Sequence, residues 1–383
     1  MTESLIKFIR ETFKQKEGFI PLHEPRFIGN EKKYVLDAID STFVSSVGQY
    51  VDKFEQMMCD ITGSKHAIAT VNGTNSLHLA LVLAGVQEND EVISQPLTFI
   101  ATANAISYTN AIPHFVDVSR ETMSLCPEIL ARHLKEHAQM KDGYCYNKVT
   151  GRKITACIPM HTFGLPGRID EIAAVCKQYN IILIEDAAES LGSYYKEKHT
   201  GTFGKIGVFS FNGNKTVTAG GGGALITDDP ELAKRAKHLS TQAKIPHKWN
   251  YEHDEIGYNY RMPNLNAALA CAQLEQLDSY IANKRQLSKL YHSFFEKINS
   301  ITYVNEIAEA KSNYWLNAII LEDRLAREVF LKETNEAGIM TRPIWTLMNK
   351  LKMFKDCPAS DLTNSEWLED RVVNITSSVR ING

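Results

Sequence analysis

The sequence contains neither a disulfide framework nor a pattern of metal ligands. Its seven cysteines stand singly, with no CxxC pair, and no cluster among its twelve histidines supports a metal site. Cys157 and Cys176 lie inside apolar runs, where a buried thiol behaves as a small hydrophobic side chain. We therefore expect structural cysteines and no metal site.

Long apolar runs and clusters of basic residues are missing as well. No run approaches the roughly 18 residues of a membrane span, and the N-terminal stretch MTESLIKFIRETFKQKEGF is amphipathic rather than signal-like. The net charge of −3, without a basic cluster, argues against nucleic acids and membrane surfaces as partners. We expect a cytoplasmic protein that binds neither.

The chain does contain enough hydrophobic residues for a full-sized core, 44% of 383, and a regular order of elements. The predicted strands are His66–Val71, Glu91–Gln95, His114–Val118, Thr155–His161 and Ile181–Asp186. These strands are nearly continuously apolar and alternate with predicted helices. This pattern predicts an α/β fold with a mostly parallel sheet covered by helices on both faces.

The pattern changes in the last third of the chain. One long helical pattern begins near Pro263 and continues to about Phe295, and a strand near Tyr314–Leu321 and a helix at Leu325–Ala337 follow. We therefore predict an N-terminal helical extension (1–20), a large domain (21–245) and a small C-terminal α+β domain that includes the long connecting helix (246–383). The polar segment NKVTGR, just before Lys153, predicts the tip of an exposed hairpin or loop insertion.

Two neighbouring strand ends between residues 181 and 227 carry an acid and a lysine. The first strand ends in Asp186, and the second is followed by Lys215 and then by four consecutive glycines. Adjacent strand ends build a pocket. Taken alone, each residue is more commonly a solvated lysine or a helix-capping aspartate. Pyridoxal phosphate, however, needs both: an amine to bind its aldehyde and a carboxylate to keep its ring nitrogen protonated.

A glycine-containing turn suits the phosphate of such a cofactor. The turn, residues 72–75, follows the first predicted strand and precedes a helix predicted from Ser76 to Ala84. Exposed amides at a helix N-terminus bind phosphate. An ordinary capped helix explains this turn equally well when it is considered alone.

Six segments resemble, in the expected order, the motifs of the DegT/DnrJ/EryC1/StrS group of sugar aminotransferases. They are NGTNSLHLAL, QPLTFIATANAI, HTFGLPGRIDEI, IEDAAESLGS, FSFNGNKTVTAGGGG and IGYNYRMPNLNAALACAQLEQL. The resemblance extends from Ile20 to Ser378. It implies the aspartate aminotransferase type of fold, known as fold type I of pyridoxal-phosphate enzymes.

The resemblance implies pyridoxal 5′-phosphate as the cofactor, bound covalently by Lys215, which also moves protons, with Asp186 beside the ring nitrogen. It implies that Phe99 and Ala188 flank the cofactor ring and that Glu189 lies near its phenolic oxygen. The cofactor phosphate is assigned to Gly73, Thr74, Asn75 and Ser210.

The resemblance also concerns assembly and the type of reaction. Asn259 resembles an asparagine that each subunit supplies to its neighbour, which implies a homodimer with shared active sites. Relatives that dehydrate sugars carry histidine in place of Lys215, so this chain is expected to transaminate. It departs from the family pattern at Glu189, where many relatives carry Gln or His, and at Asn349, where histidine is common. A carboxylate at position 189 needs a proton or a partner.

The segments PLHEP and RPIWTLM resemble the branch that acts on nucleotide-linked 4-keto-6-deoxy-N-acetylhexosamines. This branch makes precursors of bacillosamine or legionaminic acid for surface glycans such as lipopolysaccharide. The implied reaction uses L-glutamate as amino donor and a nucleotide-sugar substrate, with UDP as the expected carrier. Lys244, His247 and Lys248 are candidates for the diphosphate, or belong to a solvated loop. Arg342 either contacts substrate or pairs with a structural carboxylate.

Two other functions are compatible with these motifs. An aminotransferase for another nucleotide ketosugar, such as a dTDP-3-keto-6-deoxyhexose, would use the same cofactor chemistry. A cofactor-bound regulator or scaffold on the same fold would carry out no reaction, and the intact Lys215, Asp186 and Ser210 argue against it.

Overall fold

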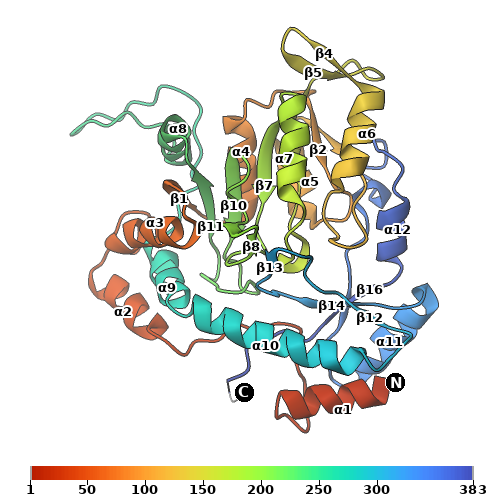
Figure 1. The fold of residues 1–383 in the computed structure, drawn as a ribbon. Coiled ribbons are helices and arrows are strands. Elements are labelled where there is room, and N and C mark those ends of the chain that lie inside the picture. The colour runs from red at the N-terminus through yellow and green to blue at the C-terminus, as the bar shows by residue number, and fades with distance from the viewer. Residues whose placement is uncertain (1, 382–383) are drawn as a thin grey trace.

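The alternating apolar segments form a seven-stranded central sheet in the computed structural model, which describes residues 2–381 (Figure 1). In spatial order its strands are β1 (His66–Thr70), β11 (Gly223–Thr227), β10 (Ile206–Ser210), β7 (Ile182–Asp186), β6 (Ile154–Ile158), β2 (Glu91–Ser94) and β3 (Ile112–Phe115). Only β11 is antiparallel to its neighbours, because the loop of residues 211–222 reverses the chain direction between β10 and β11. The predicted α/β class with a mostly parallel sheet is confirmed.

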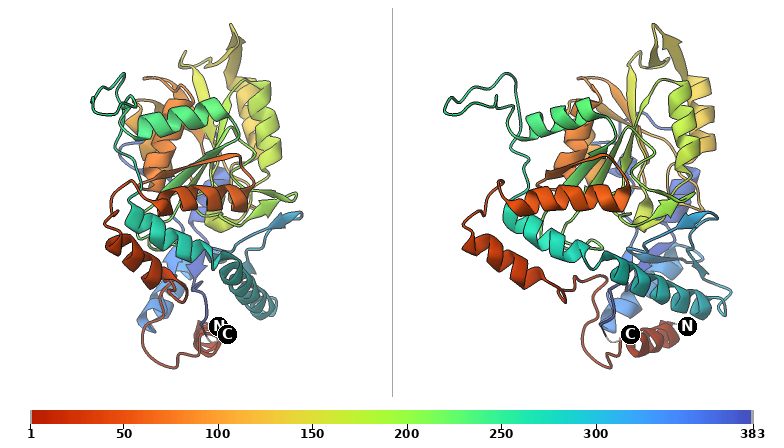
Figure 2. Two further views of the ribbon diagram at one scale, coloured as in Figure 1. Left: turned by 90° about the vertical axis from the view of Figure 1, so that its left-hand side faces the viewer. Right: turned by 60° about the vertical axis from the view of Figure 1, so that its left-hand side comes forward.

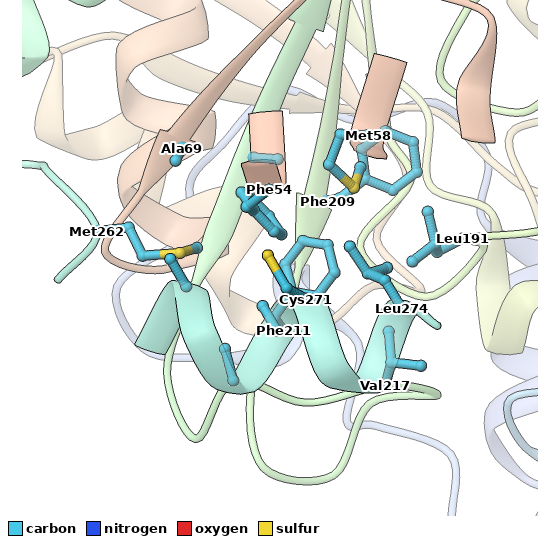
Figure 3. Close-up of a cluster of buried hydrophobic side chains, with 14 of the residues drawn as sticks. Phe54, Met58, Ala69, Leu191, Phe209, Phe211, Val217, Met262, Cys271 and Leu274 are labelled. Atoms are coloured by element: carbon cyan, nitrogen blue, oxygen red, sulfur yellow. The ribbon is translucent and has the colours of Figure 1, made fainter. Parts of the chain in front are cut away.

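Helices cover both faces of this sheet. One face packs against α4 (Gly73–Leu83), α5 (Ile100–Tyr108) and α8 (Pro230–Ser240). The other packs against α3 (Gln49–Thr62), α6 (Pro127–His137), α7 (Ile169–Gln178) and α9 (Asn264–Leu274), with α2 (Glu31–Asp40) against α9. Figure 3 shows Cys271 and Leu274 of α9 close to Phe209 and Phe211, whose rings are fully buried. This packing holds the carboxyl end of β10 in place.

A second, four-stranded antiparallel sheet forms the small domain. Its strands are β12 (Thr302–Tyr303), β14 (Asn317–Ile320), β16 (Val372–Ile375) and β15 (Arg342–Pro343). Its helical elements are α1 (Thr2–Thr12), α10 (Leu277–Phe295), α11 (Arg324–Glu336), η2 (Met348–Lys350) and α12 (Thr363–Glu369). Leu5 and Ile9 of α1 share a buried cluster with Leu287 and Ile375, so the N-terminal helix packs on this sheet. The boundaries at residues 20 and 245 stay a prediction.

The helical pattern predicted as one element from Pro263 to Phe295 is two helices, so this prediction was wrong. The chain turns at Glu275 and Gln276, between α9 and α10 (Figure 1). Glu275 accepts hydrogen bonds from Tyr34 Oη at 2.6 Å and Asn30 Nδ2 at 2.8 Å. Because α9 is buried in the large domain and α10 packs on the small one, a bend lets each helix bury its own apolar face.

Two small antiparallel units complete the fold. One contains β13 (Ala310–Lys311), β8 (Tyr194–Tyr195) and β9 (Lys198–His199), and the other is the hairpin β4 (Ala138–Lys141) and β5 (Tyr144–Asn147). The tip of this hairpin is Asp142-Gly143, with φ angles of 50° and 80°, and an Asp-Gly pair adopts such a two-residue turn readily. The segment NKVTGR forms a further exposed turn at the end of β5, closed by an antiparallel bridge between Tyr146 and Lys153 and by the Asn147 amide, which donates to Arg152 O at 2.8 Å. The prediction of an exposed hairpin tip at this segment is therefore confirmed.

At the end of each edge strand of the central sheet, a distant part of the chain forms a bridge. At β3, the Phe115 amide donates to Pro358 O at 2.8 Å, and the Ser360 amide donates to Phe115 O at 2.9 Å. At the β1 end, the Val71 amide donates to Tyr260 O at 2.8 Å. No helix among residues 2–381 has the length and apolar character that crossing a membrane requires.

Candidate active site

A cavity of about 330 Å³ opens at the carboxyl ends of β7 and β10. Binding sites in sheets of this kind form where strand ends and the following loops meet. Its walls come from both domains: Asn72, Gly73, Thr74, Leu77, Phe99, Ala101, Met160, Asp186, Ala188, Glu189, Ser210, Asn212, Asn214, Lys215, Trp315 and Trp345. The predicted acid and lysine therefore share one cavity.

Asp186 is the last residue of β7 and is 3% exposed. Its Oδ2 accepts a hydrogen bond from Thr102 Oγ1 at 2.8 Å, and its Oδ1 accepts from the Ala188 amide at 3.2 Å. Burial raises the pKa of this carboxyl, and the Thr102 hydrogen bond opposes that rise. Within residues 2–381 no cation lies within ion-pair distance of Asp186. A buried carboxylate held in this way suits a protonated ring nitrogen.

Lys215 lies in the turn after β10, where its amide donates to Asn212 O at 3.0 Å. Its Nζ lies 3.4 Å from Glu189 Oε1 and 4.2 Å from the centre of the Trp315 ring. Trp315 is itself held by its Nε1, which donates to Asn214 O at 2.6 Å. The amine is therefore positioned inside the cavity by a carboxylate and an aromatic face.

Glu189 lies in the loop after β7 and is 3% exposed. Its Oε2 accepts a hydrogen bond from the Phe163 amide at 2.8 Å. Burial raises the pKa of Glu189 to about 7, while Lys215 and the Phe163 amide act in the opposite direction and Asp186 adds to the rise. The partner that the sequence demanded for this carboxylate is therefore Lys215.

A cradle for an anion lies at the start of α4. The helix begins at Gly73, three residues earlier than predicted, so the amides of Gly73 and Thr74 belong to its first turn. A Cβ atom on Gly73 would come within 2.9 Å of the Ser210 Cβ, so only glycine allows this close approach. Gly73, Thr74 and Ser210 all line the cavity, whereas the Asn75 amide donates to Asn72 Oδ1 at 2.8 Å and Asn75 is not on its wall.

Phe99 and Ala188 also line the cavity, as a pair of residues that flank a ring must. Phe99 is 50% exposed and meets Trp345 edge-on, with ring centroids 6.4 Å apart. These contacts fit a planar cofactor between an aromatic side chain and a small one. The donor set as a whole, an amine, a buried carboxylate and an anion cradle, fits pyridoxal phosphate.

Several predicted residues lie away from this cavity. Asn259 is exposed and accepts hydrogen bonds from Arg261 Nε at 3.1 Å and Nη2 at 3.0 Å. Lys244 and His247, with Lys248 and Arg261, line a second, open concavity of about 580 Å³. Its lining lies on the segment after α8, which projects from the body in Figures 1 and 2.

Arg342 also lies outside the cavity. It is exposed, and its Nη1 donates to Asn335 Oδ1 and to Thr341 O, both at 3.0 Å. It pairs with no carboxylate among residues 2–381, although such a pair was one of its two expected roles.

The sequence reasoning missed three prominent wall or support residues. Trp315 and Trp345 enter from the small domain, and no local pattern marks a tryptophan whose partners are far away in the chain. Thr102 lies in the first turn of α5, and its hydroxyl is 3.0 Å from that of Thr98, which precedes the helix. No helical spacing in the sequence marks this contact.

Fold and cavity together define a pyridoxal-phosphate-dependent aminotransferase. Residues 25–383 match the model of the DegT/DnrJ/EryC1/StrS aminotransferase family, and the chain belongs to this family. The resemblance inferred from the six motifs is thus confirmed, and with it the enzyme class, a pyridoxal-phosphate-dependent sugar aminotransferase.

Similar proteins support this assignment. The chain is 39% identical over 339 residues to a GDP-perosamine synthase of Escherichia coli O157:H7, covering 88% of both chains. It is 37% identical over 335 residues to the putative pyridoxal phosphate-dependent aminotransferase EpsN of Bacillus subtilis, covering 88% of this chain and 84% of that one. The aminotransferase TlmJ from Streptoalloteichus hindustanus has the same fold, with a TM-score of 0.85 at 22% identity over 94% of each chain.

Proposed function

We propose that this chain is a cytoplasmic aminotransferase that moves the amino group of L-glutamate to the C-4 ketone of a UDP-linked 4-keto-6-deoxy-N-acetylhexosamine. The observation that carries the substrate proposal is the aromatic wall of Phe99, Trp315 and Trp345 around the amine of Lys215. An apolar wall suits a sugar whose C-6 carries a methyl group in place of a hydroxyl, because it offers that hydroxyl no partner. The product would serve surface glycans through a bacillosamine or legionaminic acid type of precursor.

Each residue of the cavity would have a distinct task. When bound, pyridoxal phosphate supplies the carbon that carries the amino group between donor and acceptor and a ring that takes up electrons. Asp186 would keep a proton on the ring nitrogen, and Phe99 and Ala188 would hold the ring flat between them. Lys215 would bind the cofactor and move a proton at its Nζ.

The remaining residues would position phosphate and substrate. Gly73, Thr74 and Ser210 would bind the cofactor phosphate through amides and a hydroxyl, at the positive end of α4. Trp315 and Trp345 would cover the reacting atoms and keep water away from them.

The active enzyme in this proposal is a homodimer. Asn259 and the basic concavity lie off the cavity of their own chain, so they would act on the cavity of another copy, with Lys244 and His247 near the nucleotide diphosphate. Exposed apolar side chains support such an association: Phe27, Ile28, Leu36, Ile39, Phe43 and Val47, each between 49% and 67% exposed.

A second candidate substrate is a GDP-linked ketosugar. Three of the curated relatives are GDP-perosamine synthases, from Escherichia coli, Caulobacter vibrioides and Vibrio cholerae. The cavity residues described above contact no nucleotide base, so they do not distinguish the two carriers.

Absorbance of the cofactor-loaded protein tests the proposal. L-Glutamate should remove the absorbance band of the cofactor's aldehyde form, and the UDP-linked 4-ketosugar should restore it. D-Glutamate is the matched control and should leave the band unchanged. If only a GDP- or dTDP-linked ketosugar restored the band, that compound would replace the UDP-linked sugar as the proposed substrate. If no amino donor changed the band, aminotransfer would be refuted.

A further inference from the structure

Glu189 contacts the reacting amine directly, which none of the roles above requires. Its Oε1 is 3.4 Å from Lys215 Nζ, and Lys215 is the one cation within ion-pair distance of it in residues 2–381. Both side chains line the cavity, and both are largely shielded from water, with 2% of the Glu189 and 13% of the Lys215 side chain exposed. A proton passing between these two side chains would therefore move out of contact with bulk solvent.

The other half of the carboxylate is fixed by the backbone. Phe163, in the short 3-10 element η1 (Thr162–Gly164), has a φ of 60° and directs its amide to Glu189 Oε2. A left-handed conformation is costly for a bulky residue and persists only where its surroundings enforce it. Asn313 holds the main chain on the same side, because its Nδ2 donates to Glu189 O at 2.9 Å. The Phe163 amide thus holds Glu189 Oε2, while Glu189 Oε1 faces the Lys215 amine.

The charges around Glu189 leave both of its protonation states accessible. Burial favours the neutral acid, and the neighbouring Asp186 at the end of β7 acts in the same direction. Lys215, from the loop after β10, and the Phe163 amide of η1 favour the carboxylate. The pKa of about 7 that results lies where a group both gains and loses protons near neutral pH.

We propose that Glu189 is the proton partner of Lys215, taking a proton from its ammonium group and later returning it. In the forward direction one N–H bond of Lys215 breaks and one O–H bond forms on Glu189 Oε1. The positive and negative charges cancel, so no charge has to leave the cavity. The neutral amine is then able to accept a proton from bound substrate, a step that rests on the aminotransfer proposed above.

Glu189→Gln tests this pairing, because glutamine keeps the volume and can accept the Phe163 hydrogen bond but exchanges no proton. The cofactor-free protein is treated with acetic anhydride at pH 8, and acetylation of Lys215 is followed by peptide mass spectrometry. Lys215 should react about tenfold faster or more in Glu189→Gln, because the variant lacks the charged partner that holds the Lys215 Nζ at 3.4 Å. Equal rates in variant and wild type would overturn the proposal.

The pH profile of the glutamate half-reaction gives a second readout. The wild-type rate should show an inflection near pH 7 that follows Glu189, and Glu189→Gln should lose it. Glu189→Asp, which keeps a titrating carboxyl, should retain an inflection. An unchanged profile in Glu189→Gln would contradict the proposal even if the rate fell.

Glu369→Gln is the matched control. Glu369 also accepts a backbone amide, from Leu347 at 3.0 Å, and a lysine, Lys350 Nζ at 2.5 Å, but it does not line the cavity. This variant should leave both readouts unchanged, and a change equal to that of Glu189→Gln would overturn the proposal. If no amino donor altered the cofactor absorbance, the proposed function would fail, while the acetylation experiment on cofactor-free protein would still decide the Glu189–Lys215 pair.

Discussion

The cavity and the segment after α8 are opposite kinds of surface. In the cavity, Asp186 and Glu189 are each 3% exposed and hydrogen-bonded on both sides. In the segment, Trp249, Tyr251 and Ile256 are between 70% and 86% exposed. The first holds its buried polar groups by contacts within one chain, whereas the second leaves large apolar side chains open to solvent. The difference fits the proposal that the cavity carries the chemistry and that the segment after α8 contacts another copy of the chain.

The largest effect should come from removing the amine of the cavity. Lys215→Ala should abolish turnover, because no other group in the cavity binds the cofactor's aldehyde and moves the proton. The protein should still fold, since Lys215 lies on the wall of a cavity and belongs to none of the buried apolar clusters among residues 2–381, and circular dichroism will check this. Appreciable transamination by the variant would refute the role of Lys215.

Neutralising the buried acid should be nearly as severe. Asp186→Asn keeps the shape but no longer holds a proton on the ring nitrogen, so the rate should fall by roughly two to four orders of magnitude. The rate of a single half-reaction measures this directly. The control is Asp170→Asn, a partly exposed carboxylate paired with Lys196 at 2.7 Å, and this variant should keep the wild-type rate. A near-normal rate for Asp186→Asn would mean that another group keeps the ring nitrogen protonated.

Mixed dimers of two defective variants test the comparison between the cavity and the segment after α8. Asn259→Ala should weaken cofactor retention, and mixed dimers with Lys215→Ala should regain about a quarter of the wild-type activity, because half of the dimers then contain one intact site. The measurement is activity after joint unfolding and refolding. No recovery would leave Asn259 outside the neighbouring active site.

A smaller effect is expected from the support of Asp186. Thr102→Val removes the hydroxyl that stabilises the carboxylate, so it should raise the pKa of Asp186 further and lower the half-reaction rate about tenfold, the loss of roughly one charge-assisted hydrogen bond. Thr102→Ser should restore most of the rate. A rate as high in Thr102→Val as in wild type would show that Asp186 needs no such support.

The pH dependence of stability should show the burial of Glu189. Since the folded pKa is raised from 4.5 to about 7, the protonated acid stabilises the fold, and this contribution is lost as pH rises through that range. Cofactor-free Glu189→Gln should therefore gain about 3 kcal/mol of unfolding free energy relative to wild type as the pH rises through that range. Urea unfolding of both proteins measures it. A constant difference would mean that Glu189 titrates normally.

Much of the cavity floor was predictable from sequence because its residues come from local patterns. Asp186 ends an apolar strand, and Gly73 follows one directly, so topology alone brings both to the same sheet edge. The walls were not predictable in this way. Trp315 and Trp345 reach the cavity only through the packing of the small domain, and local sequence contains no information about that.

The misplaced elements have the same cause. Pro263 to Phe295 follows one helical period throughout, and only the contacts of Glu275 with Tyr34 and Asn30 show where the chain bends. In the proposed dimer, the positions of Lys244, His247 and Asn259 relative to a cavity would depend on a second copy, which no single-chain pattern describes.

The bridge at the end of β3 has a consequence for biosynthesis. The strand is complete at residue 115, but the segment that bridges its end, residues 358–360, is made more than 240 residues later. A nascent chain folding from its N-terminus therefore carries an open strand end until that segment has been made, and open strand edges recruit strands from other chains.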